Sequence, residues 1–111
     1  MAEHSKVCKM RLTASIAEKR IHELSKSSSN VIWSGHCTER SEERGINFND
    51  ALHIMRTGHV VGTPEEGKYP GEWKCKIIRN LRGNRDAGVV VVILTKIGKL
   101  KVKTVEWEDL S

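Results

Sequence analysis

The run Gly88-Val-Val-Val-Val-Ile-Leu-Thr95 carries the clearest structural signal in this chain. Its residues are almost all β-branched, which is typical of a central strand covered on both faces. Alternating apolar and basic residues predict neighbouring strands at 73–78 and 100–104, and a phase shift at Val105 indicates a bulge or a strand end. With His59–Gly62 as an earlier strand, the second half of the chain predicts an antiparallel sheet of about four strands.

The first thirty residues predict one helix and no strand. Leu12–Leu24 has apolar residues at helical spacing, which favours an amphipathic helix. The polar stretch Ser25–Asn30 follows, and no apolar residue bridges it. We therefore expect residues 1–30 to form a leader and helical extension, and residues 31–111 to form a single α+β domain.

Short elements connect this extension to the sheet. Ser34 is a suitable N-cap for a helix, and Gly45 can end that helix in the left-handed conformation. Gly58 is expected to end the following helix in the same way. The expected elements are a short strand at Val31–Trp33 and helices at His36–Arg44 and Asp50–Thr57.

The composition is that of a small globular protein. The chain has 111 residues, a formal net charge of +5 and an ordinary apolar share. No apolar run approaches the roughly 20 residues of a membrane helix, and the chain does not begin with a signal-peptide pattern. Its three cysteines cannot all pair, which suits a reducing compartment. We therefore expect a cytoplasmic protein that does not associate with a membrane.

Positive charge is concentrated in the second half of the chain. Residues 74–103 contain nine bases and one acid, Asp86, so this segment alone carries +8 (nine minus one). Such a basic half is typical of proteins that bind a polyanion. Lysines also keep sheet edges from pairing with other sheets, so the charge alone leaves both interpretations open.

The segment Ser34–Ile46 holds the residues best suited to chemistry. His36, Arg40 and Arg44 are spaced by four, and on a helix each such step turns the position by about 40°, so all three line one side. Histidine can act as general acid or base, and arginine binds phosphate oxygens. Cleavage of RNA by its own 2′-hydroxyl needs these two functions and no metal ion. The alternative is that the arginines form ion pairs with glutamates of the same helix on a solvated face.

The cysteines and histidines predict neither a metal site nor a cofactor. The sequence contains no C-x-x-C motif, and His4 with Cys8 would supply only two ligands. Cys37 could be a nucleophile, but RNA cleavage needs none, and we expect it to be a small packing residue. Cys75 alternates with apolar residues and is expected in the core.

The pattern Ser34-x-His36-x-x-x-Arg40-x-x-x-Arg44-Gly45-Ile46, followed by Asp50 and Gly58-His59-Val60-Val61, resembles the domain-of-unknown-function 4258 family of small bacterial proteins. The resemblance extends over about residues 31–106. That family is similar to the RelE-like ribonuclease toxins, whose helices pack on one face of an antiparallel sheet. The resemblance therefore implies an α+β, RelE-like fold, with N-terminal helices packed on about four antiparallel strands, and an antitoxin protein as partner.

The resemblance also implies candidate residues. His36, Arg40 and Arg44 occupy the family's motif positions and are the candidate catalytic residues. RelE-like enzymes often place catalytic Arg, Lys, Glu, Tyr or His on the sheet. The corresponding RNA-binding candidates are Arg79, Lys101 and Lys103, followed by Lys74 and Lys76 as weaker candidates.

Three functions remain open at the level of the sequence. The first is a metal-independent endoribonuclease, the toxin of a bacterial toxin–antitoxin pair, which acts on RNA without a cofactor. The second is a non-catalytic RNA- or protein-binding module with a toxin-like fold. The third is an interaction domain whose basic surface serves only solubility. Fold alone does not distinguish them.

Overall fold

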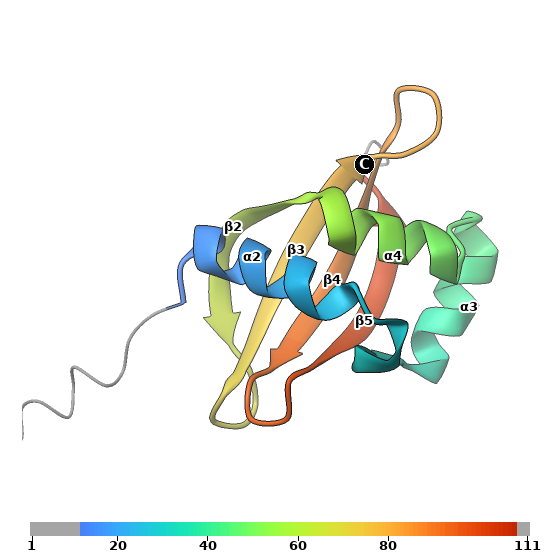
Figure 1. The fold of residues 1–111 in the computed structure, drawn as a ribbon. Helices are drawn as coiled ribbons and strands as arrows, with labels where there is room; N and C mark the ends of the chain where they lie inside the picture. Colours follow the sequence, from blue (N-terminus) through green and yellow to red (C-terminus); the bar gives the residue numbers. More distant parts are fainter. Residues whose placement is uncertain (1–11, 109–111) are drawn as a thin grey trace, which may run out of the picture.

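The computed structural model describes residues 12–108, so the leader expected at residues 1–11 lies outside the described residues. The described chain forms helices and one sheet (Figure 1). In chain order the elements are α2 (Ala14–Ser25), the 3-10 turn η1 (Ser28–Asn30), β1 (Val31–Trp33), α3 (Gly35–Arg44), α4 (Phe48–Thr57), β2 (His59–Glu66), β3 (Glu72–Asn80), β4 (Asp86–Leu94) and β5 (Lys99–Trp107). None of these helices is long and apolar enough to cross a membrane.

The sheet has five strands in the order β1-β5-β4-β3-β2. Strands β2 to β5 form the expected antiparallel meander, whereas β1 pairs with β5 in parallel. The α+β class and the four antiparallel strands are therefore confirmed, but the sheet as a whole is mixed, because β1 joins it as a fifth, parallel strand. The sequence does not predict this strand's place, because β1 pairs with a strand far away in sequence, with Ile32 opposite Lys101, and local periodicity carries no signal for such a pairing.

Helices cover one face of the sheet, where α2 and α4 cross the strands (Figure 1). On β4, Ala87, Val89, Val91 and Ile93 point into this covered face and are fully buried. The other face carries no described helix, so the expectation that β4 is covered by elements on both faces is wrong. Val92 on that face is nevertheless only 8% exposed. Its register neighbours on both sides are lysines, whose aliphatic stems can cover apolar surface.

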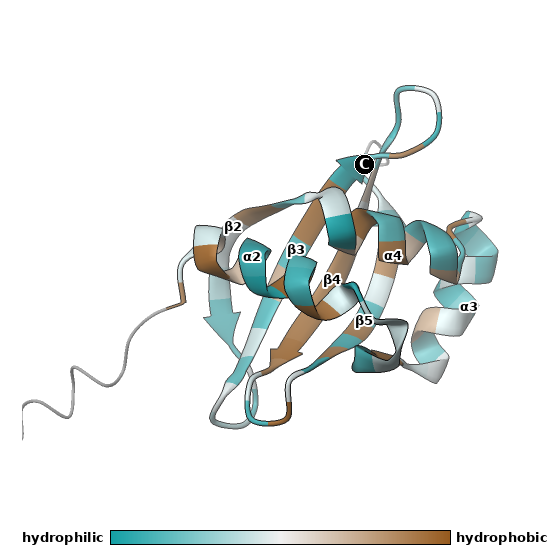
Figure 2. Ribbon diagram, viewed as in Figure 1, coloured by the Kyte–Doolittle hydropathy of each residue, from teal (hydrophilic) through white to brown (hydrophobic). Residues whose placement is uncertain are grey.

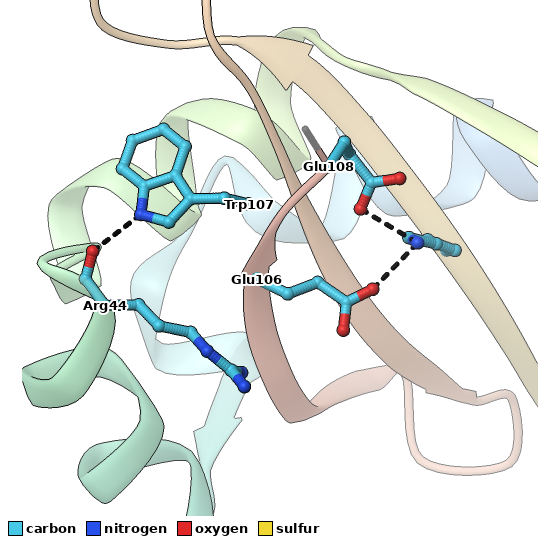
Figure 3. Close-up of a pocket in the computed structure, with 5 residues that line it drawn as sticks. Arg44, Glu106, Trp107 and Glu108 are labelled. Carbon is cyan, nitrogen blue, oxygen red and sulfur yellow. Dashed lines mark hydrogen bonds and ion pairs between the residues drawn. The ribbon is translucent and has the colours of Figure 1, made fainter. Parts of the chain in front are cut away.

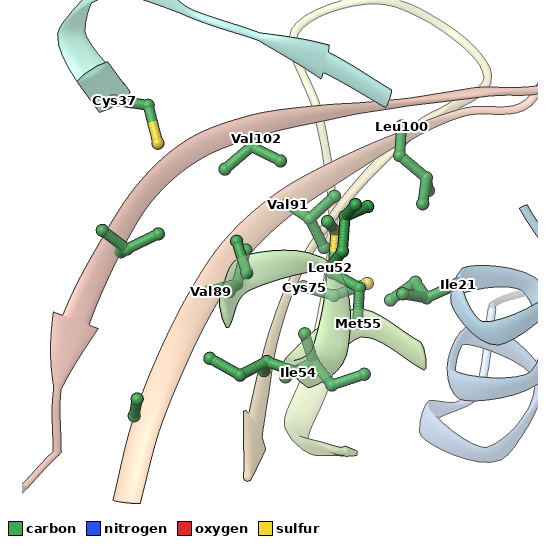
Figure 4. Packing of buried hydrophobic residues seen from close by; sticks show 14 of the residues in the cluster. Ile21, Cys37, Leu52, Ile54, Met55, Cys75, Val89, Val91, Leu100 and Val102 are labelled. Carbon is green, nitrogen blue, oxygen red and sulfur yellow. The ribbon is translucent and has the colours of Figure 1, made fainter. Parts of the chain in front are cut away.

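The core between helices and sheet includes α2. Ala17 and Ile21 of this helix are fully buried and belong to the same cluster as Ile54 and Met55 of α4 (Figure 4). In Figure 2 the apolar colour runs along β4, while α3 is mostly hydrophilic. The first helix, α2, therefore packs in the same core as the sheet.

Helix ends follow the predicted caps, with one exception. The Ser34 hydroxyl accepts a hydrogen bond from Cys37 N at 3.1 Å, and Gly45 is left-handed at φ 70°. Gly58 instead has φ −84° and ψ −172°, so the expectation of a second left-handed end is wrong. A Cβ at Gly58 would lie 2.5 Å from Ile78 O and 2.6 Å from Ile54 O. The glycine therefore permits close packing rather than an unusual φ.

The phase shift near the end of the chain is a β-bulge. Val91 pairs with Val102 and Val90 pairs with Thr104, which leaves Lys103 as the extra residue on β5. The bulge returns Val105 to the covered face, where it is fully buried. The bulge is thus confirmed over the alternative of a strand end, and β5 continues to Trp107.

Candidate functional site

The polar helix α3 is held against the outer edge of β5 mainly by hydrogen bonds. Cys37 is its one buried side chain, and it packs above Val102 (Figure 4). Trp107 Nε1 donates to Arg44 O at 2.7 Å, and Arg44 Nη1 donates to Val105 O at 2.8 Å. Because β1 pairs only with the first part of β5, these contacts satisfy backbone groups where β1 has ended.

The three motif residues of α3 have different surroundings. Arg40 Nε donates to His36 Nε2 at 3.5 Å, and Arg40 Nη1 forms an ion pair with Glu43 at 3.0 Å. His36 is exposed, so this pair lies on the surface of the helix. Arg44 turns instead to the sheet. For Arg40, the alternative of an ion pair within the helix therefore holds, and the structure brings only Arg44 of the three to the sheet.

A pocket of about 230 Å³ opens beside Arg44. Its lining residues are Arg44, Lys76, Glu106, Trp107 and Glu108. Figure 3 shows the carboxylates of Glu106 and Glu108 directed toward the same ammonium, while the Arg44 guanidinium ends beside β5 and the Trp107 indole points toward the end of α3. One predicted catalytic residue and one predicted RNA-binding residue, Lys76, thus meet in one pocket.

Lys76 is the centre of a charged cluster in this pocket. Its Nζ lies 2.7 Å from Glu106 Oε2 and 2.8 Å from Glu108 Oε2. Partial burial lowers the pKa of the ammonium, but hydrogen bonds and Coulomb attraction from the two carboxylates outweigh burial and raise the pKa above its ordinary value. Lys76 therefore stays protonated at neutral pH. Arg44 adds a second positive charge, so two bases face two acids.

Gly88 makes this cluster possible. Lys76 is on β3 and Glu106 is on β5, so the ion pair must pass over β4, which lies between them. Gly88 is the register partner of Glu106, and a Cβ there would lie 2.6 Å from Glu108 Oε2 and 3.1 Å from Lys76 Cε. The absence of a side chain at this position lets the charged groups meet above the central strand.

The remaining predicted RNA-binding residues do not form a single group. Register places Lys74 and Lys101 on either side of Val92, on the helix-free face that also carries Lys76. Lys103 is exposed at the bulge. Arg79 has the same alternation as Cys75 and Ile77 and so belongs to the helix-bearing face. Three of the five candidates therefore share a face.

Some of the basic residues in this half of the chain stabilise the fold. Arg82 Nη2 forms an ion pair with Asp50 at 2.6 Å, and its Nη1 donates to Gly45 O at 3.1 Å. The Arg85 guanidinium lies 4.0 Å from the centre of the Trp107 ring. These arginines of the β3–β4 loop hold the ends of α3, α4 and β5 together, so the +8 of this segment overstates the charge available to a ligand.

The described cysteines are packing residues. Cys37 is fully buried and Cys75 nearly so, and burial raises the pKa of each thiol to about 11. A thiol with that pKa contains little thiolate at neutral pH, which makes it a poor nucleophile. The expected packing roles of both residues are confirmed.

Glu106 and Glu108 are not among the residues that the sequence analysis predicts for the site; they lie close to Asp109 in an acidic stretch of the sequence. Two signals could have found them. Glu106 alternates with the buried Val105 and Trp107, which places it on the opposite face of the strand. Gly88 interrupts an otherwise β-branched strand, and such a glycine often marks a close approach of other groups.

Among the described residues, no group of three or more His, Cys, Asp or Glu side chains lies close enough together to hold a metal ion. Comparison of the chain with protein-family models, with curated proteins and with solved structures found no match.

Proposed function

We propose that this protein is a metal-independent endoribonuclease of the kind found as the toxin of a toxin–antitoxin pair. One observation carries the proposal: Arg44, Lys76, Glu106 and Glu108 converge in one pocket. Cleavage of RNA through the 2′-hydroxyl needs a base, an acid and positive charge beside the phosphate. This pocket contains all three kinds of group, and the helix motif suggests the same activity through its resemblance to ribonuclease toxins.

Each group has a defined role in the proposed reaction. Glu106 removes the proton from the 2′-hydroxyl, whose oxygen then forms a bond to phosphorus while the bond to the 5′-oxygen breaks. Lys76 donates a proton to the leaving 5′-oxygen and recovers one from Glu106, 2.7 Å away. The products are a 2′,3′-cyclic phosphate and a free 5′-hydroxyl, so one proton moves from the first oxygen to the second.

Arg44 supports the charge that develops on phosphorus. One of its N–H groups donates to Val105 O, which fixes the guanidinium at the rim of the pocket. Within residues 12–108 the guanidinium makes no other hydrogen bond, which leaves its remaining N–H groups for phosphate oxygens. Since this interaction strengthens as the phosphorus gains negative charge, it would lower the barrier rather than only bind the substrate.

The proposal moves the general base from His36 to Glu106. His36 does not line the pocket, and its Nε2 accepts from Arg40 on the surface of α3. A base must reach the proton it removes within about 3 Å, directly or through one water. Replacing each residue in turn therefore distinguishes the two assignments.

The decisive experiment incubates the purified protein with total RNA in the presence of a chelator. We expect cleavage by the wild type and a loss of about 100-fold or more in rate for Glu106→Gln. Glu42→Gln, an exposed glutamate of α3, is the matched control and should cleave like the wild type. Expression of the wild type should slow bacterial growth, and Glu106→Gln should relieve this.

Two results would contradict these assignments. If His36→Ala reduces the rate of RNA cleavage as much as Glu106→Gln does, His36 rather than Glu106 is the general base. Intact RNA at every concentration of wild-type protein, together with salt-sensitive RNA binding, would identify a non-catalytic binding module instead.

A further inference from the structure

The helix-free face of the sheet continues from the pocket along β4. Gly88 lies at the pocket end, and Val90, Val92 and Leu94 follow on the same face. At about 3.4 Å per residue, Gly88 and Leu94 are about 20 Å apart. This apolar row forms the floor of a path that begins at Lys76 and leads away from it.

Charge is distributed unequally across this path. On one side, β5 contributes three bases without an acid between them until Glu106. They are Lys99, Lys101 and Lys103. On the other side, this face carries two acidic residues near Lys74, namely Glu65 of β2, which is the register partner of Lys74, and Glu72 of β3. Within the described residues neither Lys101 nor Lys103 forms an ion pair. A polyanion on this face would therefore lie over β4 and β5.

The path ends at a second pocket, of about 390 Å³, between two hairpin turns. Leu94 and Glu72, which are register partners on the helix-free face, belong to its lining together with Tyr69 and Ile97. Tyr69 is 59% exposed and Ile97 is 62% exposed. Thr95 N donates to Gly71 O at 3.0 Å, so a backbone hydrogen bond joins the two turns that line the pocket.

An exposed tyrosine in such a setting suits a nucleobase. The Tyr69 ring has Lys68 Nζ 5.8 Å from its centre, so a base on the ring would have positive charge nearby for its phosphate. Lys96 lines the same pocket and supplies a second charge. Aromatic rings interleaved with lysines are the usual means of binding single-stranded nucleic acid.

We propose that the helix-free face binds single-stranded RNA along β4, with phosphates over the lysines of β5 and one base stacked on Tyr69. This inference rests on the proposed function, since it extends the substrate from the cleavage pocket to a second contact. A distance of about 20 Å corresponds to roughly three to six nucleotides, the larger number for a stacked strand. The base that stacks on Tyr69 therefore lies roughly three to six nucleotides from the cleaved phosphate.

The test measures binding and cleavage separately. Binding uses a single-stranded 2′-O-methyl oligonucleotide of about a dozen nucleotides, which cannot be cleaved because its 2′-hydroxyls are blocked. Tyr69→Ala should raise the dissociation constant about tenfold, while Tyr69→Phe keeps the ring and should bind like the wild type. Lys101→Ala should also weaken binding, whereas Lys19→Ala, an exposed lysine on α2, should not.

Cleavage then locates the base. In a set of cleavable RNAs that each lack one base, the loss of the base at one particular position should raise the KM of the wild type. That position should have no effect in Tyr69→Ala, because the stacking partner is already missing. A wild type that binds this RNA and depends on Tyr69, yet leaves it uncut, supports the path and rejects the cleavage mechanism.

Three results would overturn the path. The first is an unchanged KM for Tyr69→Ala, because this substitution removes only the stacking contact and leaves the cleavage pocket as it is. The second is equal sensitivity to every abasic position. The third is RNA binding unaffected by both Tyr69→Ala and Lys101→Ala, which would leave this face to a protein partner.

Discussion

The two faces of the sheet are built from the same strands and differ in nearly every other respect. On the face under the helices, the residues of β4 are aliphatic and fully buried, and they pack against α2 and α4. On the opposite face, the alternate residues of β4 form an apolar row between lysines and carboxylates. The first face provides the stability of the molecule, and the second provides charged and apolar groups to a ligand.

This difference shows how a strand that looks uniform in sequence can serve two purposes. The valines of β4 are chemically alike, yet Val91 belongs to a closed core and Val90 to an open surface. Adjacent residues of one strand point to opposite faces, so a pair of neighbours can be used to compare the faces directly.

The largest effect is expected from Ile77→Ala on β3. Ile77 is fully buried under the helices, so the truncation removes apolar contacts and leaves a cavity, at a cost of about 2–5 kcal/mol in the free energy of unfolding. Its neighbour Ile78 lies half-buried on the other face, and Ile78→Ala should cost about 1 kcal/mol. Urea denaturation measures both. Equal losses would show that the two faces contribute alike to stability.

A smaller effect on stability, but a large one on activity, is expected from Gly88→Ala. The new Cβ would push the side chains of Glu108 and Lys76 apart. Because both side chains are flexible, the free energy of unfolding should fall by only about 1 kcal/mol. The proposed reaction should slow about 100-fold, since it depends on the placement of these groups. Urea denaturation and RNA cleavage provide the two measurements.

The matched control for that substitution is Gly35→Ala. A Cβ at Gly35 would meet no atom within 4 Å, so the same chemical change should leave cleavage unaffected. A Gly88→Ala variant that retains wild-type cleavage would separate the charged cluster from the reaction.

The smallest effect concerns the pH dependence of stability. The pKa of Lys76 in the folded protein lies above its ordinary value of 10.5. The contribution of the Lys76 charge to the free energy of unfolding is therefore fully present below pH 10.5 and is lost as the pH rises through the folded-state pKa. Lys76 is a third exposed, which limits the contribution to about 1 kcal/mol or less. Wild type and Lys76→Met should therefore differ by a constant amount from about pH 7 to about pH 10 and converge above it.

The pH comparison also has a lysine control. Lys74 lies on the same strand and face, and within the described residues it forms no ion pair. Lys74→Met therefore reports the effect of removing a lysine without the two carboxylates. A stability difference for Lys76→Met that widens in alkali would contradict the sign of the pKa change.

Local patterns predicted most of the elements, and they failed where a residue's role depends on distant contacts. Ser34 and Gly45 behave as expected because a cap and a left-handed helix end are interactions within a few residues. Gly58 was assigned the same role as Gly45 but is needed to approach β3. The sequence position of the two glycines is similar, and only packing distinguishes them.

The candidate site was predicted in part for the same reason. Arg44 and Lys76 were both singled out, one from the helix motif and one from the alternation of a strand. Their meeting could not be predicted, and neither could the separation of Arg44 from His36, because the helix orientation depends on the hydrogen bonds of α3 to β5.

The sequence by itself determined the helices, the antiparallel meander, the bulge and the burial of Cys37 and Cys75, because these follow from periodicity and contacts between near neighbours. Tertiary structure alone decided that β1 joins β5 in parallel, that the helices of residues 12–108 all leave one face of the sheet uncovered, and that Lys76 reaches Glu106 and Glu108 over Gly88. The physical reason is that strand register, which relates residues far apart in the chain, is set by packing of the whole core.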